Sequence, residues 1–169
     1  MISLSSVVPI IVFVLLSASY VHAVSGNFYA IVIDGGSTGS RAFVYHFVEE
    51  NGEKDVRGME GQKVSPGISS FSSKPHDAAA YLAPVLIHCK TLIPEEFHNK
   101  TIVYFQATAG MRLLSETDQK NIFISLLEGL KQNSEIPFVI TEDAFGVIDG
   151  RHEAYYAVLA SNFIIGRID

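Results

Sequence analysis

Short apolar runs alternate with polar, glycine-rich segments in the first third of this chain. The runs Phe28–Ile33 and Ala42–Val48 are rich in β-branched and aromatic residues, which predicts two strands. Between them lies "DGGSTGSR", so we expect a hairpin with a glycine-bearing turn. Val56–Val64 is a third strand candidate, interrupted by two glycines.

Longer helical patterns alternate with short strands in the rest of the chain. A serine-rich loop, "SPGISSFSSKP", precedes them. The predicted elements are a helix over His76–Leu92 with an irregularity at Pro84, a strand over Thr101–Gln106, a helix from Ser115 to about Gln132, a strand over Pro137–Ile140, and a helical pattern from a candidate N-cap at Thr141 to Ile165, interrupted at Gly146 and Gly150. The order is βββαβαβα, which predicts an α/β fold with helices packed on a mixed sheet.

The chain begins with an apolar stretch, Val7–Leu16, followed by "SASYVHA". This length is typical of the hydrophobic part of a signal peptide, with small residues before a cleavage site after residue 23. A membrane anchor formed by residues 7–23 is the alternative, although a span needs about 20 apolar residues. We therefore expect a signal peptide over residues 1–23, a folded domain over 24–169, and entry into the secretory pathway.

Charge argues against one class of partner. The 169 residues carry 18 acidic and 12 basic side chains, a formal net charge of -6, and show no stripe of Lys or Arg. Nucleic-acid binding proteins need such a stripe to neutralise phosphates. We expect no nucleic-acid partner, and the oligomeric state is open.

Two single residues add smaller expectations. The lone cysteine, Cys89, excludes a disulfide within the chain, and we expect it to be buried in a helix. The tripeptide "NKT" at Asn99–Thr101 is a glycosylation sequon, which predicts a glycan at Asn99 if the chain is secreted.

The segment after the first strand has the composition of a phosphate-binding loop. Its glycines allow close backbone approach and positive φ angles, its hydroxyl groups add donors, and an arginine can pair with phosphate oxygens. The candidate phosphate-binding residues are Gly36, Ser37, Thr38, Gly39, Ser40 and Arg41. Asp34 at the strand end is a candidate for holding a divalent cation through water. A tight polar hairpin without a ligand is the alternative.

Two further segments carry candidate chemistry. In "QATAGMRLL" a buried strand ends in Thr108, Ala109 and Gly110, where a ligand can approach the backbone. In "GVIDGRHEAYYAVL" the acid Glu153 lies early in an otherwise apolar helix and is a candidate general base acting on water. Taken singly, the first is also compatible with an ordinary strand-to-helix turn, and the second with a surface glutamate.

Taken together, the three segments resemble the N-terminal half of the apyrase family, the ectonucleoside triphosphate diphosphohydrolases. "IDGGSTGSR" resembles the first conserved region of that family, with Gly35 where many members have alanine. "ATAGMRLL" matches the second region and "GRHEAYYAV" resembles the third. The resemblance covers nearly all of Asn27–Arg167, and three motifs in the same order are a specific signal.

The resemblance implies a fold and an activity. The family hydrolyses terminal phosphates of nucleoside tri- and diphosphates with Ca²⁺ or Mg²⁺, and its fold is similar to an actin-like (ribonuclease H-like) ATPase lobe. By this resemblance Glu153 activates the attacking water, Asp34 orients metal-bound water, and residues 37–41 hold the phosphates. Thr108 supports the metal and water network, with Ala109 and Gly110 beside the phosphates. The compartment is the extracellular space, the cell surface or the Golgi lumen.

A large part of the family pattern is missing. The second glycine-rich phosphate loop and the whole second lobe have no counterpart in these residues. Because each lost charge-stabilising group costs about 10²–10³ in rate, we expect this chain alone to be nearly inactive. The alternative is a non-catalytic secreted short form that binds a nucleotide or a protein. An exopolyphosphatase-like chain, which shares the hairpin, is a third interpretation that "ATAGMRLL" disfavours.

Overall fold

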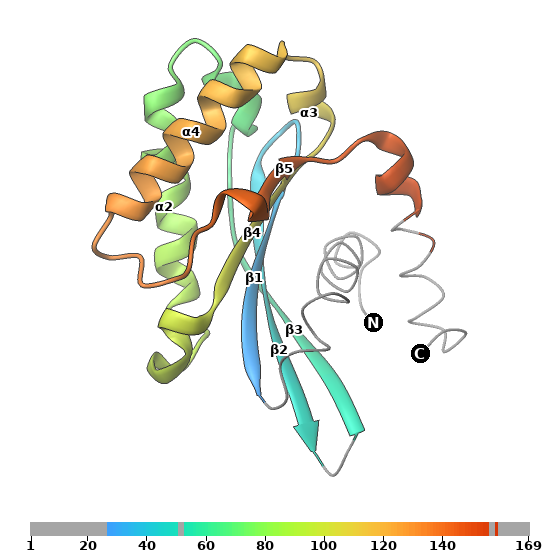
Figure 1. Cartoon of the computed structure of the whole chain (residues 1–169), viewed down its shortest axis with the longest axis vertical. Coiled ribbons are helices and arrows are strands. Elements are labelled where there is room, and N and C mark those ends of the chain that lie inside the picture. The colour runs from blue at the N-terminus through green and yellow to red at the C-terminus, as the bar shows by residue number, and fades with distance from the viewer. Residues whose placement is uncertain (1–26, 51–52, 156–157, 159–169) are drawn as a thin grey trace.

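A five-stranded mixed sheet forms the centre of the molecule (Figure 1). The computed structural model describes residues 27–50, 53–155 and 158. The strands are β1 (Phe28–Gly35), β2 (Ser40–Glu50), β3 (Glu53–Val64), β4 (Ile102–Ala107) and β5 (Phe145–Val147), in the spatial order β3-β2-β1-β4-β5. The first three form an antiparallel meander, whereas β4 and β5 run parallel to β1.

Helices connect the parallel strands. The α-helices are α2 (Ala78–Cys89), α3 (Ala109–Arg112) and α4 (Glu116–Gln132), and 3₁₀ turns lie at Ile68–Phe71, Pro75–Asp77, Glu95–Lys100 and Glu142–Ala144. The predicted start of α4 is confirmed, because the Ser115 side chain accepts a hydrogen bond from the Asp118 N–H at 3.1 Å. The predicted helix around Pro84 is shorter at both ends, and α2 continues through the proline.

The two faces of the sheet have separate apolar cores. Ile31 and Ile33 of β1 belong to the larger core, to which the buried residues of α2 and α4 contribute. The side chains in between, Ala30 and Val32, belong to a smaller cluster on the other face. In Figure 1, α2 and α4 lie on one side of the sheet, and the helical turn that follows β5 lies on the other.

The fifth strand is not where the apolar pattern placed it. We expected a strand over Pro137–Ile140, but this segment makes a single bridge, between Val139 and Ile102. The residues that pair with β4 are Phe145–Val147, inside the region expected to be a helix from Thr141 onward. That expectation is wrong for residues 145–149, whereas residues 142–144 form a 3₁₀ turn and residues 150–155 and 158 are helical. Residues 156, 157 and 159–165 of the expected pattern lie outside the described part of the chain. A short buried segment is apolar both when it forms a strand of the sheet and when it only packs beside the sheet, so apolar residues alone do not distinguish the two cases.

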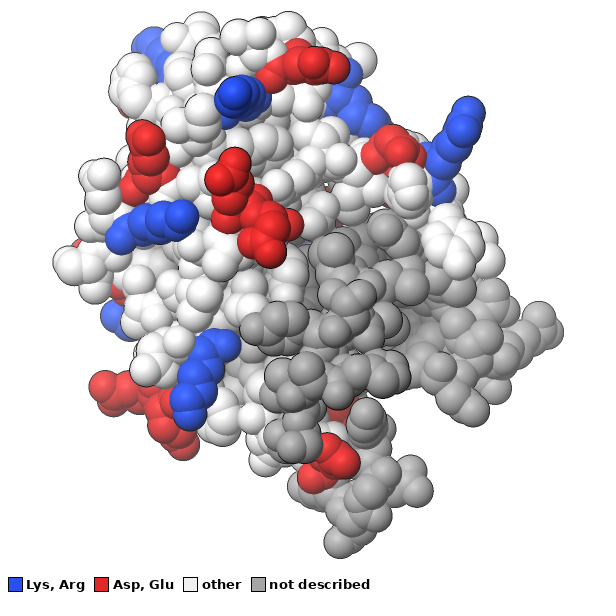
Figure 2. All heavy atoms as spheres, in the orientation of Figure 1, with Lys and Arg blue, Asp and Glu red and all other residues white. Residues whose placement is uncertain are grey.

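The remaining expectations of the sequence have mixed outcomes. Cys89 is buried in α2, as expected, and its burial raises the pKa of the thiol to about 12. The proposed signal peptide over residues 1–23 lies outside the described residues. Among the residues that are described, no helix is long and apolar enough to cross a bilayer. Acidic and basic side chains are interspersed on the face seen in Figure 2.

Candidate active site

The carboxyl ends of the three parallel strands meet at one edge of the sheet. Gly35 of β1 is level with Ala107 of β4, and Ala107 is level with Val147 of β5. The next residues continue this alignment, since the Thr108 N–H donates to the Gly35 carbonyl at 3.1 Å and the Ile148 N–H to the Ala107 carbonyl at 2.9 Å. The three segments singled out in the sequence therefore leave the sheet side by side, where α/β folds bind ligands.

Alternation along the strands determines which side chains face the candidate site. Asp34 lies on the same face as Val32, away from α2 and α4. Arg41 of β2 and Gln106 of β4 are its direct neighbours in register, and side chains level with one another share a face. Asp34, Arg41 and Gln106 thus form a polar row across three strands. Arg41 also pairs with the Glu60 carboxylate at 3.3 Å.

The first loop needs its glycines for space rather than for unusual backbone angles. None of the described glycines has a φ in the left-handed region, so the expected positive φ angles do not occur there. A Cβ on Gly35 would lie 2.8 Å from the Phe105 ring, and a Cβ on Gly39 would overlap the Val64 carbonyl oxygen. A larger residue at either position would therefore require a shift, of the Phe105 ring at Gly35 and of the β3 backbone at Gly39.

Two more glycines press against the same loop. A Cβ on Gly67 would lie 2.6 Å from the Gly36 carbonyl oxygen and even closer to that of Ser37. A Cβ on Gly110 would lie 3.1 Å from Ser37 Cα and 2.7 Å from Ser69 Oγ. The loop therefore rests on segments from before α2 and from α3, which hold its backbone in place.

We expect Gly67→Ala to destabilise the fold by about 1–3 kcal/mol, because the added methyl group must displace two backbone carbonyls. The midpoint of urea unfolding measures this loss. Gly150→Ala is the matched control, since a Cβ there has no neighbour within 4 Å. Equal midpoints for Gly67→Ala and the wild type would contradict the packing described here.

Ser40 is the predicted phosphate-binding residue that faces away from the others. Its side chain is fully buried, and its Oγ lies 3.5 Å from the Tyr81 hydroxyl of α2. That hydroxyl also contacts the carbonyls of Val64 and Pro66. Ser40 therefore ties the hairpin to the helical side of the sheet. Ser37 and Thr38, by contrast, are exposed at the tip of the loop.

Glu153 lies in the helical turn after β5, and an aspartate begins that turn. The Asp149 carboxylate accepts hydrogen bonds from the N–H groups of Arg151 and His152, both at 2.9 Å, and contacts the His152 ring at 2.7 Å. These bonds, first of all the one from the His152 N–H, lower the pKa of Asp149. The Glu153 N–H completes the turn by donating to the Asp149 carbonyl at 3.0 Å. This cap, not Thr141, starts the helix.

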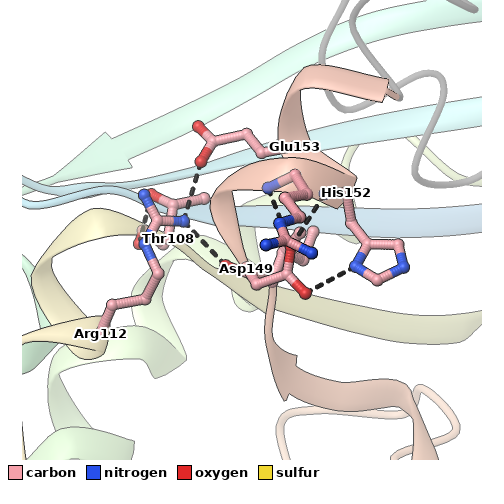
Figure 3. A network of polar contacts seen from close by, with 8 residues as sticks. Thr108, Arg112, Asp149, His152 and Glu153 are labelled. Atoms are coloured by element: carbon pink, nitrogen blue, oxygen red, sulfur yellow. Dashed lines mark hydrogen bonds and ion pairs between the residues drawn. The ribbon is translucent and has the colours of Figure 1, made fainter.

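The segment Thr108–Arg112, which follows β4 and includes α3, contacts this turn through the Arg112 side chain (Figure 3). Arg112 Nη1 lies 2.9 Å from Glu153 Oε2 and donates to the Ile148 carbonyl at 2.7 Å. Thr108, at the start of the same loop, has its hydroxyl 3.4 Å from the Gly35 carbonyl. The structure thus brings together Asp34, Thr108 and Glu153 from three strand ends, and Ala109 and Gly110 follow Thr108 at the start of α3.

Asp34 and Glu153 interact electrostatically. The pKa of Asp34 is raised, first by burial of its carboxyl group and next by the negative charge of Glu153. The cations of Arg41 and Lys63 oppose this rise. Two carboxylates that repel each other in a half-buried place favour a bound cation between or beside them.

We expect Asp34→Asn to stabilise the fold at pH 7. Folding raises the pKa of Asp34 above its value in the unfolded chain, which is about 3.9. The contribution of this group to stability is therefore greatest below the unfolded-state pKa and is lost as the pH rises through the folded-state pKa. Asparagine avoids the cost of the buried charge. The midpoint of thermal unfolding should rise at pH 7 and approach that of the wild type near pH 4.

The exposed Asp143 provides the control for that measurement, since Asp143→Asn removes a carboxylate without removing a buried charge. A lower midpoint for Asp34→Asn at pH 7 would show that its charge stabilises the fold instead.

The residues present fit a hard divalent cation held mainly through water. In the described part of the chain, no group of three or more His, Cys, Asp or Glu side chains comes together as a direct metal site. Mg²⁺ usually keeps several waters and uses only one or two carboxylates together with substrate phosphates. The Asp34 carboxylate, with the Thr108 hydroxyl at the neighbouring strand end, matches that kind of donor set.

Sequence reasoning missed three residues that belong to this arrangement. Arg112 lies within "ATAGMRLL", and an arginine two residues after Gly110 is a usable signal for a charged contact. Gln106 required the register with Asp34, which only the sheet shows. Gly67 was assigned to a plain loop, and the pair Pro66–Gly67 was the only local hint of a special backbone position.

Comparisons with known proteins agree with the fold and the motifs. The profile of the GDA1/CD39 (nucleoside phosphatase) family matches residues 22–169. Ectonucleoside triphosphate diphosphohydrolase 7 of Mus musculus is 37% identical over 152 residues, which cover 83% of this chain and 25% of that protein. Guanosine-diphosphatase of Schizosaccharomyces pombe is 34% identical over 152 residues, which cover 90% of this chain and 27% of that protein.

A solved structure supports the fold. The crystal structure of nucleoside triphosphate hydrolases from Neospora caninum superposes with a TM-score of 0.59 at 17% identity, and the match covers 94% of this chain and 36% of that chain. This likeness confirms one lobe of the expected actin-like fold. The chain spans about a quarter of the length of the two curated relatives described above. By its profile match and its relatives, the chain belongs to the GDA1/CD39 (nucleoside phosphatase) family.

Proposed function

We propose that the protein carrying this chain hydrolyses the terminal phosphate of nucleoside di- and triphosphates, with Glu153 as the general base. The observation that carries the proposal is the meeting of a small-residue loop, a half-buried aspartate and a glutamate at one sheet edge. The motifs and the family of the chain are consistent with this chemistry.

In the proposed reaction the oxygen of a water attacks the terminal phosphorus. The bond from that phosphorus to the bridging oxygen breaks, the shortened nucleotide leaves with the bridging oxygen, and Glu153 accepts the proton of the water. Arg112 Nη1 donates a hydrogen bond to Glu153 Oε2, and no hydrogen bond to Oε1 is present among the described residues. Oε1 is therefore the proposed acceptor of the proton.

The loop residues bind and orient the phosphates. The backbone of Gly36–Gly39 and the exposed hydroxyls of Ser37 and Thr38 offer donors to the phosphate oxygens, and Arg41 adds charge. Gly110 lets the backbone of α3 pack directly against Ser37, which supports the loop. A bound Ca²⁺ or Mg²⁺ supplies positive charge that polarises the phosphate, and Asp34 and Thr108 are the residues proposed to hold it through water.

This lobe alone is proposed to be nearly inactive, and the proposed location is the secretory pathway. Residues 1–23 support the location as a signal peptide, or residues 7–23 as an anchor. Asn99 is a proposed glycosylation site, and the exposure of its side chain at the end of a 3₁₀ turn favours this.

Phosphate release from ATP, ADP, GDP and UDP with Ca²⁺ or Mg²⁺ tests the proposal. It is measured on the 169-residue chain and on a longer protein that joins this chain to a second lobe of the family, with a chelator as control. We expect cation-dependent release from the longer protein and little from the chain. Absence of release from a folded longer protein would contradict the proposed function.

A further inference from the structure

We propose that Arg112 is the positioning residue of Glu153: it fixes the carboxylate of the base relative to the phosphate loop. This inference rests on the proposed function for its meaning in catalysis. The contact on which it stands is independent of that function, because Arg112 joins two segments that are 41 residues apart in the sequence.

The geometry connects the base to the sheet through one nitrogen. Arg112 Nη1 lies 2.7 Å from the Ile148 carbonyl oxygen and 2.9 Å from Glu153 Oε2. The carbonyl belongs to the buried residue directly after β5, and the carboxylate belongs to the first turn of the helix that follows (Figure 3). A planar, permanently charged guanidinium is suited to hold two acceptors at fixed positions.

The backbone of Arg112 belongs to α3, which packs against the phosphate loop. This helix begins directly after Thr108, whose N–H bonds to the Gly35 carbonyl at the end of β1. Met111, next to Arg112, is fully buried in the core, and Gly110 packs against Ser37 of the loop. A continuous chain of contacts therefore runs from the phosphate loop through α3 to Glu153.

Without this contact the base has little to hold it. The Glu153 side chain is 36% exposed, and Arg112 is the only hydrogen-bond partner of its carboxylate among the described residues. A free glutamate side chain rotates about three bonds, and ordering it costs conformational entropy. Misplacing a reacting group by about 1 Å can cost about 10²-fold in rate. The ion pair selects the rotamer in which Oε2 faces α3.

Direct binding of the substrate phosphate by Arg112 is the competing role. A residue that binds the substrate phosphate contributes to ground-state binding, so its removal raises KM. Removal of a positioning residue lowers kcat instead. The contacts of Arg112 favour positioning, because Nη1 already donates to two protein acceptors, one of which is a backbone carbonyl that no substrate can replace.

The kinetic test uses the longer protein that includes this chain. We expect Arg112→Ala to lower kcat for phosphate release about 10–100-fold while KM stays within about threefold. Arg112→Lys should recover part of the loss, because one ammonium group can reach the carboxylate or the carbonyl. In the Glu153→Gln background, Arg112→Ala should cause little further loss, because the two residues act as a unit.

The exposed pair of Arg57 and Asp55 provides the control. It has the same 2.9 Å length, but its side chains are 60% and 61% exposed. Arg57→Ala should leave both kcat and KM unchanged. A rise in KM of more than about tenfold for Arg112→Ala with kcat preserved would overturn the positioning role in favour of phosphate binding, and so would fully additive losses in the double variant.

Hydrogen exchange tests the contact without catalysis. Arg112→Ala should speed amide exchange in the turn from Ile148 to Glu153 at least about tenfold, with exchange in α4 unchanged. Unchanged exchange in that turn would overturn the proposal. Faster exchange in a protein that releases no phosphate would support the role of Arg112 and refute the proposed function instead, so the two failures are distinguishable.

Discussion

Replacing Glu153 by glutamine is expected to lower kcat for phosphate release by about 10²–10⁴-fold in the longer protein that includes this chain. The amide keeps the shape of the side chain and can still contact Arg112 Nη1, which lies 2.9 Å from Oε2. It cannot accept a proton from water, so the loss falls on the chemical step. KM should change little, because Glu153 is not among the residues proposed to hold the phosphates.

Steady-state phosphate release at saturating nucleotide measures this loss. Glu142→Gln is the matched control, since Glu142 is exposed in the 3₁₀ turn just before β5. That variant should behave as the wild type. A Glu153→Gln variant that kept its rate within about threefold would remove Glu153 from the role of base and leave the family assignment untouched.

Phe105→Ala is expected to cause the largest loss of folding stability, about 3–5 kcal/mol. The ring is fully buried, with its centroid 5.7 Å from that of Phe145 and 6.1 Å from that of Phe123. It also occupies the space beside Gly35, so it supports the end of β1. Since domains of this size are stable by about 5–15 kcal/mol, this one truncation removes a large share.

Urea unfolding measures the loss, and Phe105→Leu tests its cause. Leucine keeps most of the buried volume, so we expect a cost of about 1 kcal/mol for that change. If Phe105→Ala lost no more than Phe105→Leu, the ring would not be the packing centre described here. A separate measurement of phosphate release, at temperatures where Phe105→Ala remains folded, shows whether the loop after Gly35 depends on the Phe105 ring.

The sequence by itself determined the local parts of this protein. The β-branched runs predicted β1 and β2, and the apolar periodicity with Ser115 predicted α4, because strand and helix patterns arise from neighbouring residues. The order of small-residue loops and one acid was enough to indicate a nucleoside phosphatase family, which the profile match confirms. The fold class followed from the order of the elements.

Only the tertiary structure decided which of these parts touch. Val139 lies in the more apolar segment, yet it makes a single bridge to β4, whereas Phe145–Val147 pair with that strand in register. Gly67 supports a loop thirty residues earlier, and Arg112 bonds to Glu153, 41 residues later. The physical reason is the same in each case: non-local contacts depend on the three-dimensional path of the chain, and no local pattern of hydrophobic and polar residues records that path.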